Sequence, residues 1–230
     1  MGDSDAQERE RKKLEARVYW DVVSERPISI AGKLGKMLRE PAYLMSVIRK
    51  NVRFGKPRAL SILTTDRIVL EQQIFDFYRQ SADIQNILFV GCDADTARYH
   101  EYFPGCRFIT LEPLADNRSF GAPQHIVGTM EDMGAHIPAE SLDLVLCNGV
   151  FGWGLDEKEH CEKAFAAAHR ALRPDGHLLV GWNDVPRRVP VPLENVESLR
   201  LFRRYDCPLF GTWRYLTDTV YRHTFDFYKK

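Results

Sequence analysis

The chain carries a glycine followed by acidic residues at the end of an apolar run. Residues 87–95 read Ile-Leu-Phe-Val-Gly-Cys-Asp-Ala-Asp, so four apolar residues stop at Gly91 and are followed by Asp93 and Asp95. An apolar run that ends in this way is typical of a buried parallel strand entering a nucleotide-binding loop. Such loops usually carry further glycines, and here aspartates take their places.

A second acidic residue, Glu112, ends the run Phe-Ile-Thr-Leu-Glu and follows Gly91 by 21 residues. A carboxylate at that spacing can accept both hydroxyl groups of an adenosine ribose. Nicotinamide-dependent oxidoreductases share these two features, but two aspartates beside a diphosphate would be repelled and would lose solvation. A cofactor that carries a positive sulfonium and a free amino group reverses this effect. S-adenosylmethionine is such a cofactor.

Two later strand ends supply more candidate ligands. In Gly-Thr-Met-Glu-Asp-Met (128–133), Thr129 or Glu131 is expected to bond the edge of an adenine. Met130 either packs on the adenine face or belongs to the core. Asn148 follows the apolar run 142–147 and either caps the next turn or faces the methyl group of the cofactor.

The rhythm of the sequence after residue 84 predicts the elements that position these residues. Short apolar runs alternate with helical patterns, which specifies a mainly parallel, doubly wound α/β sheet with helices on both faces. Two aromatic-rich runs near the C-terminus are too close together for a crossover helix, so the sheet is expected to end in an antiparallel hairpin. The predicted strands are 87–90, 107–111, 125–127, 142–147 and 177–181, the predicted helices are 94–102 and 157–172, and the hairpin is formed by 213–216 and 222–228.

The chain is predicted to divide into a helical N-terminal cap or lid (1–83) and a cofactor-binding core (84–230). Apolar residues recur at helical spacing before residue 84. Between Lys33 and Arg58 there are eight basic residues and one acid, Glu40. This segment is either a solvated helix face or part of a lid that steers an acidic substrate towards the site.

The bulk composition is that of an ordinary globular protein. Among 230 residues, 32 basic side chains balance 32 acidic ones, so nucleic acid is not expected as a partner. The five cysteines form no Cys-x-x-Cys pair, which favours reduced thiols and a cytoplasmic location over a disulfide framework or a metal site. The sequence contains no apolar run of about 18 residues, so we expect neither a signal peptide nor a membrane span.

Taken together, these motifs resemble the class I S-adenosylmethionine-dependent methyltransferase family from about residue 84 to the C-terminus. The resemblance is carried by Ile-Leu-Phe-Val-Gly-Cys, Phe-Ile-Thr-Leu-Glu-Pro, Ser-Leu-Asp-Leu-Val-Leu-Cys-Asn-Gly and the terminal hairpin. The most specific motif is Leu-Arg-Pro-Asp-Gly-His-Leu-Leu-Val (172–180), in which Pro174 is expected to stop a helix and Gly176 to allow a tight turn. The resemblance implies an enzyme with a Rossmann-like sheet of seven strands.

The resemblance also implies a set of cofactor-binding residues. They are Gly91, Cys92, Asp93, Glu112, Pro113, Thr129, Met130, Glu131, Asn148 and Gly149. The family loop commonly reads Asp/Glu-x-Gly-x-Gly-x-Gly, whereas Phe89 stands at the acidic position here and Asp93 replaces a glycine. We therefore expect Asp93 to contact the α-amino group of the cofactor, because aspartate tolerates a positive φ better than most residues.

On the acceptor side, the aromatic residues Phe151, Trp153 and Trp182 are expected to form a substrate wall for a small aromatic or acidic molecule. Asp184 or His160 is the candidate general base, although in-line methyl transfer does not always need one. No Asn-Pro-Pro-Tyr element follows residue 148, which argues against amino methylation of a nucleobase. A non-catalytic methyltransferase-like binding module is the alternative function, and a nicotinamide-dependent oxidoreductase is the third. The sequence predicts no oligomeric state.

Overall fold

The computed structural model describes residues 65–217, 219 and 221–230. The helical patterns before residue 64 and the basic segment therefore lie outside the described residues. The chain divides into two compact units, of which the first holds Met1–Ile68 and Asp218–Tyr221 and the second holds Val69–Thr217 and Arg222–Lys230. The predicted domain boundary after residue 83 stays a prediction.

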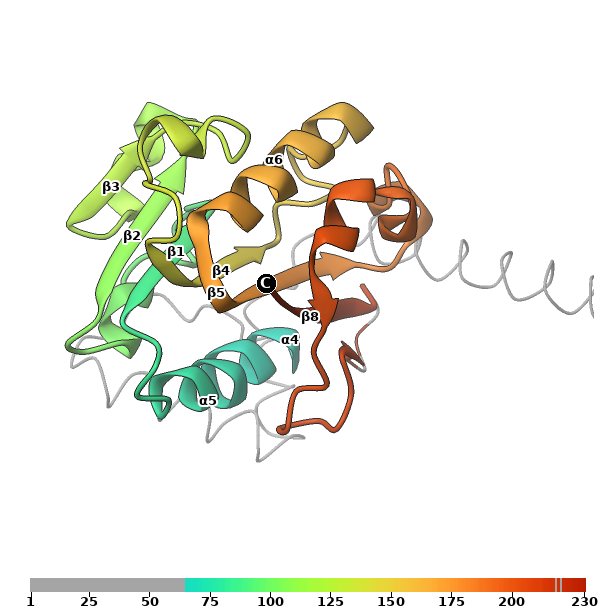
Figure 1. Cartoon of the computed structure of the whole chain (residues 1–230), viewed down its shortest axis with the longest axis horizontal. Coiled ribbons are helices and arrows are strands. Elements are labelled where there is room, and N and C mark those ends of the chain that lie inside the picture. Colours follow the sequence, from blue (N-terminus) through green and yellow to red (C-terminus); the bar gives the residue numbers. More distant parts are fainter. Residues whose placement is uncertain (1–64, 218, 220) are drawn as a thin grey trace, which may run out of the picture. The chain divides into compact units, whose positions relative to one another are not determined.

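The elements of the described chain alternate between strands and helical segments (Figure 1). The first unit contributes α4 (Thr65–Ile68), and the second begins with a π-helical segment, η1, that continues into α5. The strands are β1 (Asn86–Val90), β2 (Arg107–Glu112), β3 (Gln124–Val127), β4 (Leu142–Asn148), β5 (Leu172–Asn183), β6 (Arg203–Arg204), β7 (Arg214–Leu216) and β8 (His223–Lys229). The helical segments are η1 (Val69–Ile74), α5 (Phe75–Arg79), η2 (Tyr99–Tyr102), η3 (Ala115–Phe120), η4 (Met133–Ala135), α6 (Lys158–Ala171), η5 (Pro186–Arg188), η6 (Leu193–Asn195) and η7 (Glu197–Leu201).

The strands form one sheet in the order β3-β2-β1-β4-β5-β8-β6, with β7 also paired to β8. Strands β1 to β5 are parallel, and β8 runs antiparallel to β5, β6 and β7. The predicted doubly wound, mainly parallel sheet and its terminal antiparallel hairpin are therefore confirmed. The strand order reverses between β1 and β4, and this switch point is where open α/β sheets bind their ligands.

The two faces of the sheet are covered by different helices. On one face, Leu88, Val145 and Val180 pack in a common core with Phe165 of α6. On the other face, Phe89 contacts Tyr99, and the ring of Tyr99 lies edge-on to Phe75 of α5. Because successive strand residues point to opposite faces, the near-continuous apolar runs seen in the sequence are those of strands buried on both sides.

The predicted helix 94–102 is wrong. Residues 94–98 form turns, and only Tyr99–Tyr102 make a short 3-10 segment. Arg98 adopts a left-handed conformation with φ 73°, which a continuous α-helix does not allow. The physical reason lies in Asp93 and Thr96, whose side chains bond nearby backbone or each other's amides and so compete with helical hydrogen bonds.

The turn after α6 also differs in detail from its prediction. The helix ends at Ala171, before Pro174, and β5 begins directly at Leu172 with an irregular register. The left-handed position is Asp175, with φ 62°, rather than Gly176. Gly176 is needed for another reason, because a Cβ there would lie 2.9 Å from the carbonyl oxygen of Arg173.

The start of the sheet is held by a buried carboxylate, Asp143, which is 5% exposed. It accepts hydrogen bonds from the backbone amides of Gln85 (2.8 Å) and Asn86 (2.7 Å), and its other oxygen pairs with the guanidinium of Arg173. Burial alone raises the pKa of this carboxyl, but these hydrogen bonds outweigh burial and hold the pKa below its ordinary value. Asp143 thereby ties β4 to the strands on either side of it.

In the described part of the chain, none of the helices is both long enough and apolar enough to cross a membrane.

Replacing Asp143 with alanine is expected to lower the free energy of unfolding at neutral pH by about 2–3 kcal/mol, because two backbone amides and Arg173 lose their acceptor. A folded-state pKa below the ordinary value of 3.8 means that the carboxylate stabilises the fold above that pH. The contribution is lost as the pH falls further, through the folded-state pKa. Urea unfolding of both proteins at neutral and acidic pH measures this difference.

Glu159→Ala is the matched control, because Glu159 is 75% exposed and, in the part of the chain that the structure describes, pairs only with Lys163 one helical turn away. We expect it to change the free energy of unfolding by no more than about 0.5 kcal/mol. Equal effects of the two substitutions would contradict the role given to Asp143.

Candidate active site

The loop after β1 turns sharply at Gly91, as the sequence predicts. Its φ is 84°, its amide donates to the carbonyl oxygen of Leu111 (2.9 Å), and a Cβ added to it would lie 2.9 Å from Val150 Cγ2. Both the backbone conformation and the close approach of the β4 loop therefore require glycine at this position. The loop brings the carboxyl ends of β1, β2 and β4 together at the switch point of the sheet.

Glu112, the last residue of β2, lies at the centre of this junction and is 6% exposed. Its Oε2 accepts the backbone amide of Cys92 (2.9 Å), while Oε1 accepts the amide of Leu114 (3.0 Å) and the side-chain amide of Asn117 (3.3 Å). The carboxylate thus joins the loops that follow β1 and β2. Pro113, which lies between Glu112 and Leu114 in the chain, is exposed.

The acidic residues of the loop are on the surface. Asp93 Oδ1 accepts the backbone amides of Asp95 (2.8 Å) and Thr96 (2.9 Å), so it caps the turn that replaces the predicted helix. The backbone of Asp93 does not have a positive φ, so the turn does not depend on the ability of aspartate to adopt that conformation. Within the described residues its second oxygen, Oδ2, accepts no hydrogen bond, and its charge faces solvent beside the loop.

Cys92 precedes Asp93 in the loop and is buried. Burial, together with the nearby Glu112 carboxylate, raises the pKa of its thiol to about 12. The thiol is therefore neutral at physiological pH and is no nucleophile. Its backbone amide, not its sulfur, takes part in the loop junction.

The segment after β3 contains the three residues expected near an adenine. Met130 is 3% exposed and belongs to the core on the α6 face. Thr129 Oγ1 bonds Asp132 Oδ2 (3.1 Å), which closes the turn. Glu131 Oε1 lies 3.7 Å from Nδ1 of His160, so two predicted site residues from different elements meet.

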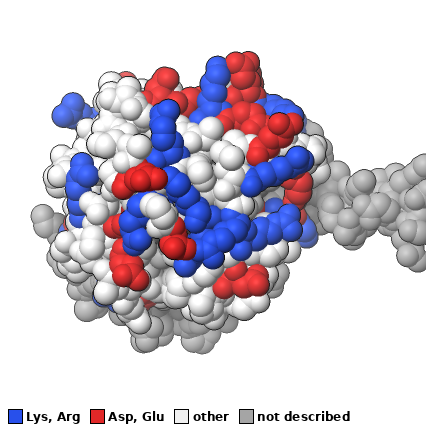
Figure 2. Space-filling model, in the orientation of Figure 1, with Lys and Arg blue, Asp and Glu red and all other residues white. Residues whose placement is uncertain are grey.

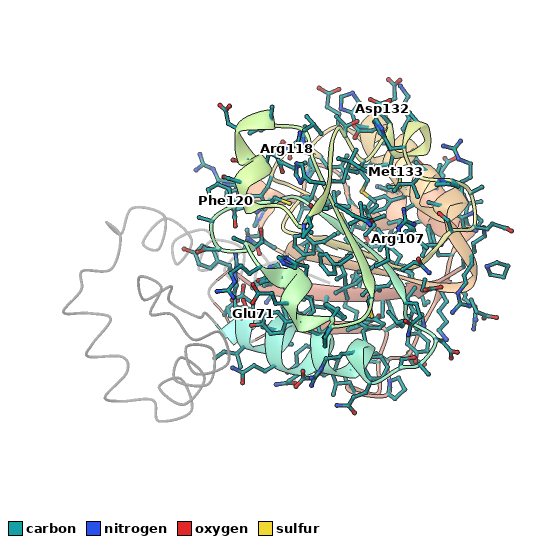
Figure 3. All side chains as sticks on the ribbon, turned by 90° about the vertical axis from the view of Figure 1, so that its left-hand side faces the viewer. Glu71, Arg107, Arg118, Phe120, Asp132 and Met133 are labelled. Atoms are coloured by element: carbon teal, nitrogen blue, oxygen red, sulfur yellow. The ribbon has the colours of Figure 1, made fainter. Side chains whose placement is uncertain are left out.

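Figure 3 views the molecule from the β3 side, where Arg118 and Phe120 mark η3 and Asp132 and Met133 mark the segment after β3. These are the two loops that follow β2 and β3. Glu71 is labelled on the helical segment before β1, and its buried carboxylate accepts the hydroxyls of Tyr99 (2.9 Å) and Tyr102 (3.0 Å).

The carboxyl ends of β4 and β5 and the first residue of β8 meet in a buried polar network. Asn148 Oδ1 lies 3.1 Å from His223 Nε2, and His223 Nδ1 lies 2.6 Å from Asn183 Oδ1. His223 is 6% exposed. A Cβ on Gly181 would overlap the Asn148 carboxamide, so glycine at this position is a condition for the network.

Gly149 follows Asn148 with φ 70° and donates its amide to the carbonyl oxygen of Gly181 (2.8 Å). This bond extends the pairing of β4 and β5 by one residue and aims the next loop outwards. The histidine of the network was not singled out in the sequence, because its partners are 40 and 75 residues away. The sequence did offer one indication of this network, Gly181 inside an apolar strand. A glycine in a strand often marks a place where another group approaches the backbone closely.

Two of the three residues predicted to form the substrate wall are buried, and the predicted wall stays a prediction. Phe151 is 0% exposed and Trp182 is 5% exposed, and both belong to the core on the α6 face. Trp182 Nε1 donates to the buried carboxylate of Asp226 (3.2 Å). Trp153 is different, since it is 53% exposed and carries the guanidinium of Arg188 over its ring at 3.2 Å.

The two candidate bases have different surroundings. Asp184 Oδ2 forms an ion pair with Arg222 Nη2 at 2.9 Å. His160 lies in the first turns of α6 with its side chain 47% exposed. Among the described residues, no group of three His, Cys, Asp or Glu side chains is placed to hold a metal ion.

Comparison with protein families matches residues 90–180, from the end of β1 to β5, to a family described as a methyltransferase domain. The chain is also similar to the uncharacterized methyltransferase-like protein C25B8.10 of Schizosaccharomyces pombe, with 36% identity over 76 residues. That alignment covers 33% of this chain and 27% of the yeast protein, so the chain matches about a quarter of the relative's length.

Solved structures share the fold at low sequence identity. The N-methyltransferase NodS from Bradyrhizobium japonicum has a TM-score of 0.53 and 16% identity, over 70% of this chain and 94% of NodS. A further NodS structure, in complex with S-adenosylhomocysteine, has a TM-score of 0.54 and 14% identity, over 71% and 87% of the two chains. A methyltransferase from Archaeoglobus fulgidus gives 0.50 and 13%, over 72% and 92%. Residues 90–180 are therefore similar to a methyltransferase domain, and the described chain shares its fold with these methyltransferase structures.

Proposed function

We propose that the chain transfers a methyl group from S-adenosylmethionine to a small-molecule acceptor. The observation that carries this proposal is the junction at Glu112, where the loops after β1 and β2 meet beside the switch point of the sheet. The cofactor would supply a methyl group made electrophilic by a positive sulfonium. The charge of this loop suits such a group, since Glu112 and Asp93 offer carboxylates where a diphosphate would need donors.

Each end of the cofactor has a candidate partner. Glu112 would accept the ribose hydroxyls, and Asn117, whose bond to Oε1 is the longest of the three at 3.3 Å, is the donor most easily displaced. The free oxygen of Asp93 would accept the α-amino group while Oδ1 continues to cap its turn. Thr129 and Glu131 would bond the adenine edge above the Met130 side chain in the core.

The acceptor would lie at the rim formed by the loops after β4 and β5. Arg188 Nη1 donates to the carbonyl oxygen of Gly152 (3.0 Å) and its guanidinium covers the ring of Trp153, so the two loops hold each other. An exposed indole beside a guanidinium suits an aromatic or acidic molecule. Asn148, fixed by His223, would orient the acceptor, because alignment supplies most of the acceleration of an in-line displacement.

Asp93→Asn tests the contact to the amino group and keeps the capping oxygen. We expect the Kd of S-adenosylmethionine and of S-adenosylhomocysteine to rise about five- to tenfold, because the ligand ammonium loses its counter-charge. The control ligand is 5′-methylthioadenosine, which lacks the amino group and should bind both proteins alike. Calorimetry gives all of these constants. An unchanged Kd for S-adenosylmethionine would remove Asp93 from the site.

Gly181→Ala tests the orientation of Asn148. The added Cβ would displace the carboxamide, so we expect kcat to fall by on the order of ten- to hundredfold while the Kd of the cofactor changes little. Gly128→Ala is the matched control, because its Cβ would meet nothing closer than 3.5 Å. Steady-state kinetics with urea unfolding of each variant separates lost alignment from lost stability. Normal turnover by a folded Gly181→Ala protein would exclude Asn148 from alignment.

The proposed activity is tested with methyl-labelled S-adenosylmethionine and a panel of small phenols, aromatic amines and aromatic carboxylic acids. We expect one class of acceptor to become labelled and S-adenosylhomocysteine to accumulate in equal amount. Binding of the cofactor without labelling of any acceptor would instead support the non-catalytic module.

A further inference from the structure

A cavity of about 250 Å³ lies between the α6 face of the sheet and the segment that carries η6 and η7. Its walls come from these two helical segments and from β6, β7 and β8, with Trp213 between β6 and β7. The lining residues are Leu193, Glu194, Val196, Leu199, Arg200, Phe202, Arg204, Trp213, Arg214 and Tyr228. The volume is just below the usual range of ligand pockets, about 300–1,000 Å³, and suits a single substituted ring.

This cavity is separate from the methyl-transfer site. Tyr228 of β8 lines it, and Asp226 of the same strand points the same way, towards Trp182. His223, which takes part in the network with Asn148, stands three residues before Asp226 and therefore faces the other side of the sheet. Strand β8 thus contributes side chains to the cavity from one face and to the Asn148 network from the other.

The inner polar side of the cavity is Arg214, which is fixed by carboxylates. Its Nε and Nη2 each lie 2.7 Å from an oxygen of Asp226, and Nη1 lies 3.0 Å from Glu194. The Asp226 side chain is 0% exposed and that of Arg214 is 30% exposed, so the carboxylate of the pair is shielded from water. Because three hydrogen bonds to carboxylates hold the Arg214 guanidinium, we expect it to keep its position when a ligand binds.

The outer side carries two arginines that lack such partners. Within the described residues, neither Arg200 nor Arg204 forms a salt bridge, and both are exposed. Arg204 instead lies over the ring of Trp213 at 4.1 Å, where Arg214 also approaches at 4.5 Å. Figure 2 shows Lys and Arg side chains gathered across the middle of this face, over the orange and red segments of Figure 1.

We propose that this cavity binds a small aromatic monocarboxylate. The apolar and aromatic walls accept a ring, and the two unpaired guanidinium groups at the mouth accept a carboxylate, which they can bind through two parallel hydrogen bonds. The lining holds three arginines and one carboxylate, Glu194, and Arg214 is also paired with Asp226 outside the lining, so these five groups together carry one net positive charge. That balance matches a monoanion and disfavours a doubly charged phosphate.

The test uses benzoate as the probe and the full chain labelled with ¹⁵N. Titration is expected to shift the indole resonance of Trp213 and to give a Kd that Arg204→Gln raises about tenfold. Arg200→Gln should raise the Kd as well, which provides a second variant if one folds poorly. Benzamide, which has the same shape without the charge, should bind about tenfold more weakly than benzoate.

Arg203→Gln is the matched control, because Arg203 neighbours Arg204 on β6, pairs with Asp175 and does not line the cavity. It should leave the Kd within about twofold. Saturating S-adenosylhomocysteine should not displace benzoate. Equal binding by wild type and Arg204→Gln, displacement by S-adenosylhomocysteine, or no shift of Trp213 at millimolar benzoate would each overturn the proposal.

Discussion

The candidate site depends on the burial of one carboxylate, Glu112. A buried charge is costly unless hydrogen bonds surround it, and this one receives three donors from two loops. The loop after β1 and the loop after β2 are therefore fixed relative to each other, although the regular helix that was expected to follow β1 is absent. The sharp turn at Gly91 makes this possible, since it brings the Cys92 amide within reach of the carboxylate.

The sheet separates the Asn148–His223 network on one face from the Arg214–Asp226 pair on the other. On the face of Asn148 and His223, polar side chains from three strand ends meet at the rim where an acceptor would lie. On the α6 face, the buried carboxylate of Asp226 pairs with Arg214 beside a cavity that is also lined by Arg200 and Arg204, which form no salt bridge within the described residues. Strand β8 serves both faces because its alternate residues point in opposite directions. The C-terminal hairpin thus both ends the sheet and supplies side chains to the network and to the cavity.

The sequence predicted what depends on local pattern. The apolar runs located the parallel strands, and the short connection near the C-terminus indicated the antiparallel pairing of β8, because both properties follow from neighbouring residues. It failed where hydrogen bonds of side chains compete with helix formation, as Asp93 and Thr96 do. It also could not tell which aromatic residue of a glycine-rich loop turns inwards, so Phe151 was assigned to a wall although it is buried. The Asn148–His223 contact joins residues 75 apart and needs the folded sheet.

The central claim is that the junction at Glu112 holds S-adenosylmethionine. Calorimetric titration of the wild-type chain and of Glu112→Gln with S-adenosylhomocysteine and with a nicotinamide dinucleotide tests it most directly. The account predicts one site for S-adenosylhomocysteine, about tenfold weaker in the variant, and no heat from the dinucleotide. Absence of S-adenosylhomocysteine binding at high micromolar concentrations, or binding that is equal in wild type and Glu112→Gln, would contradict it.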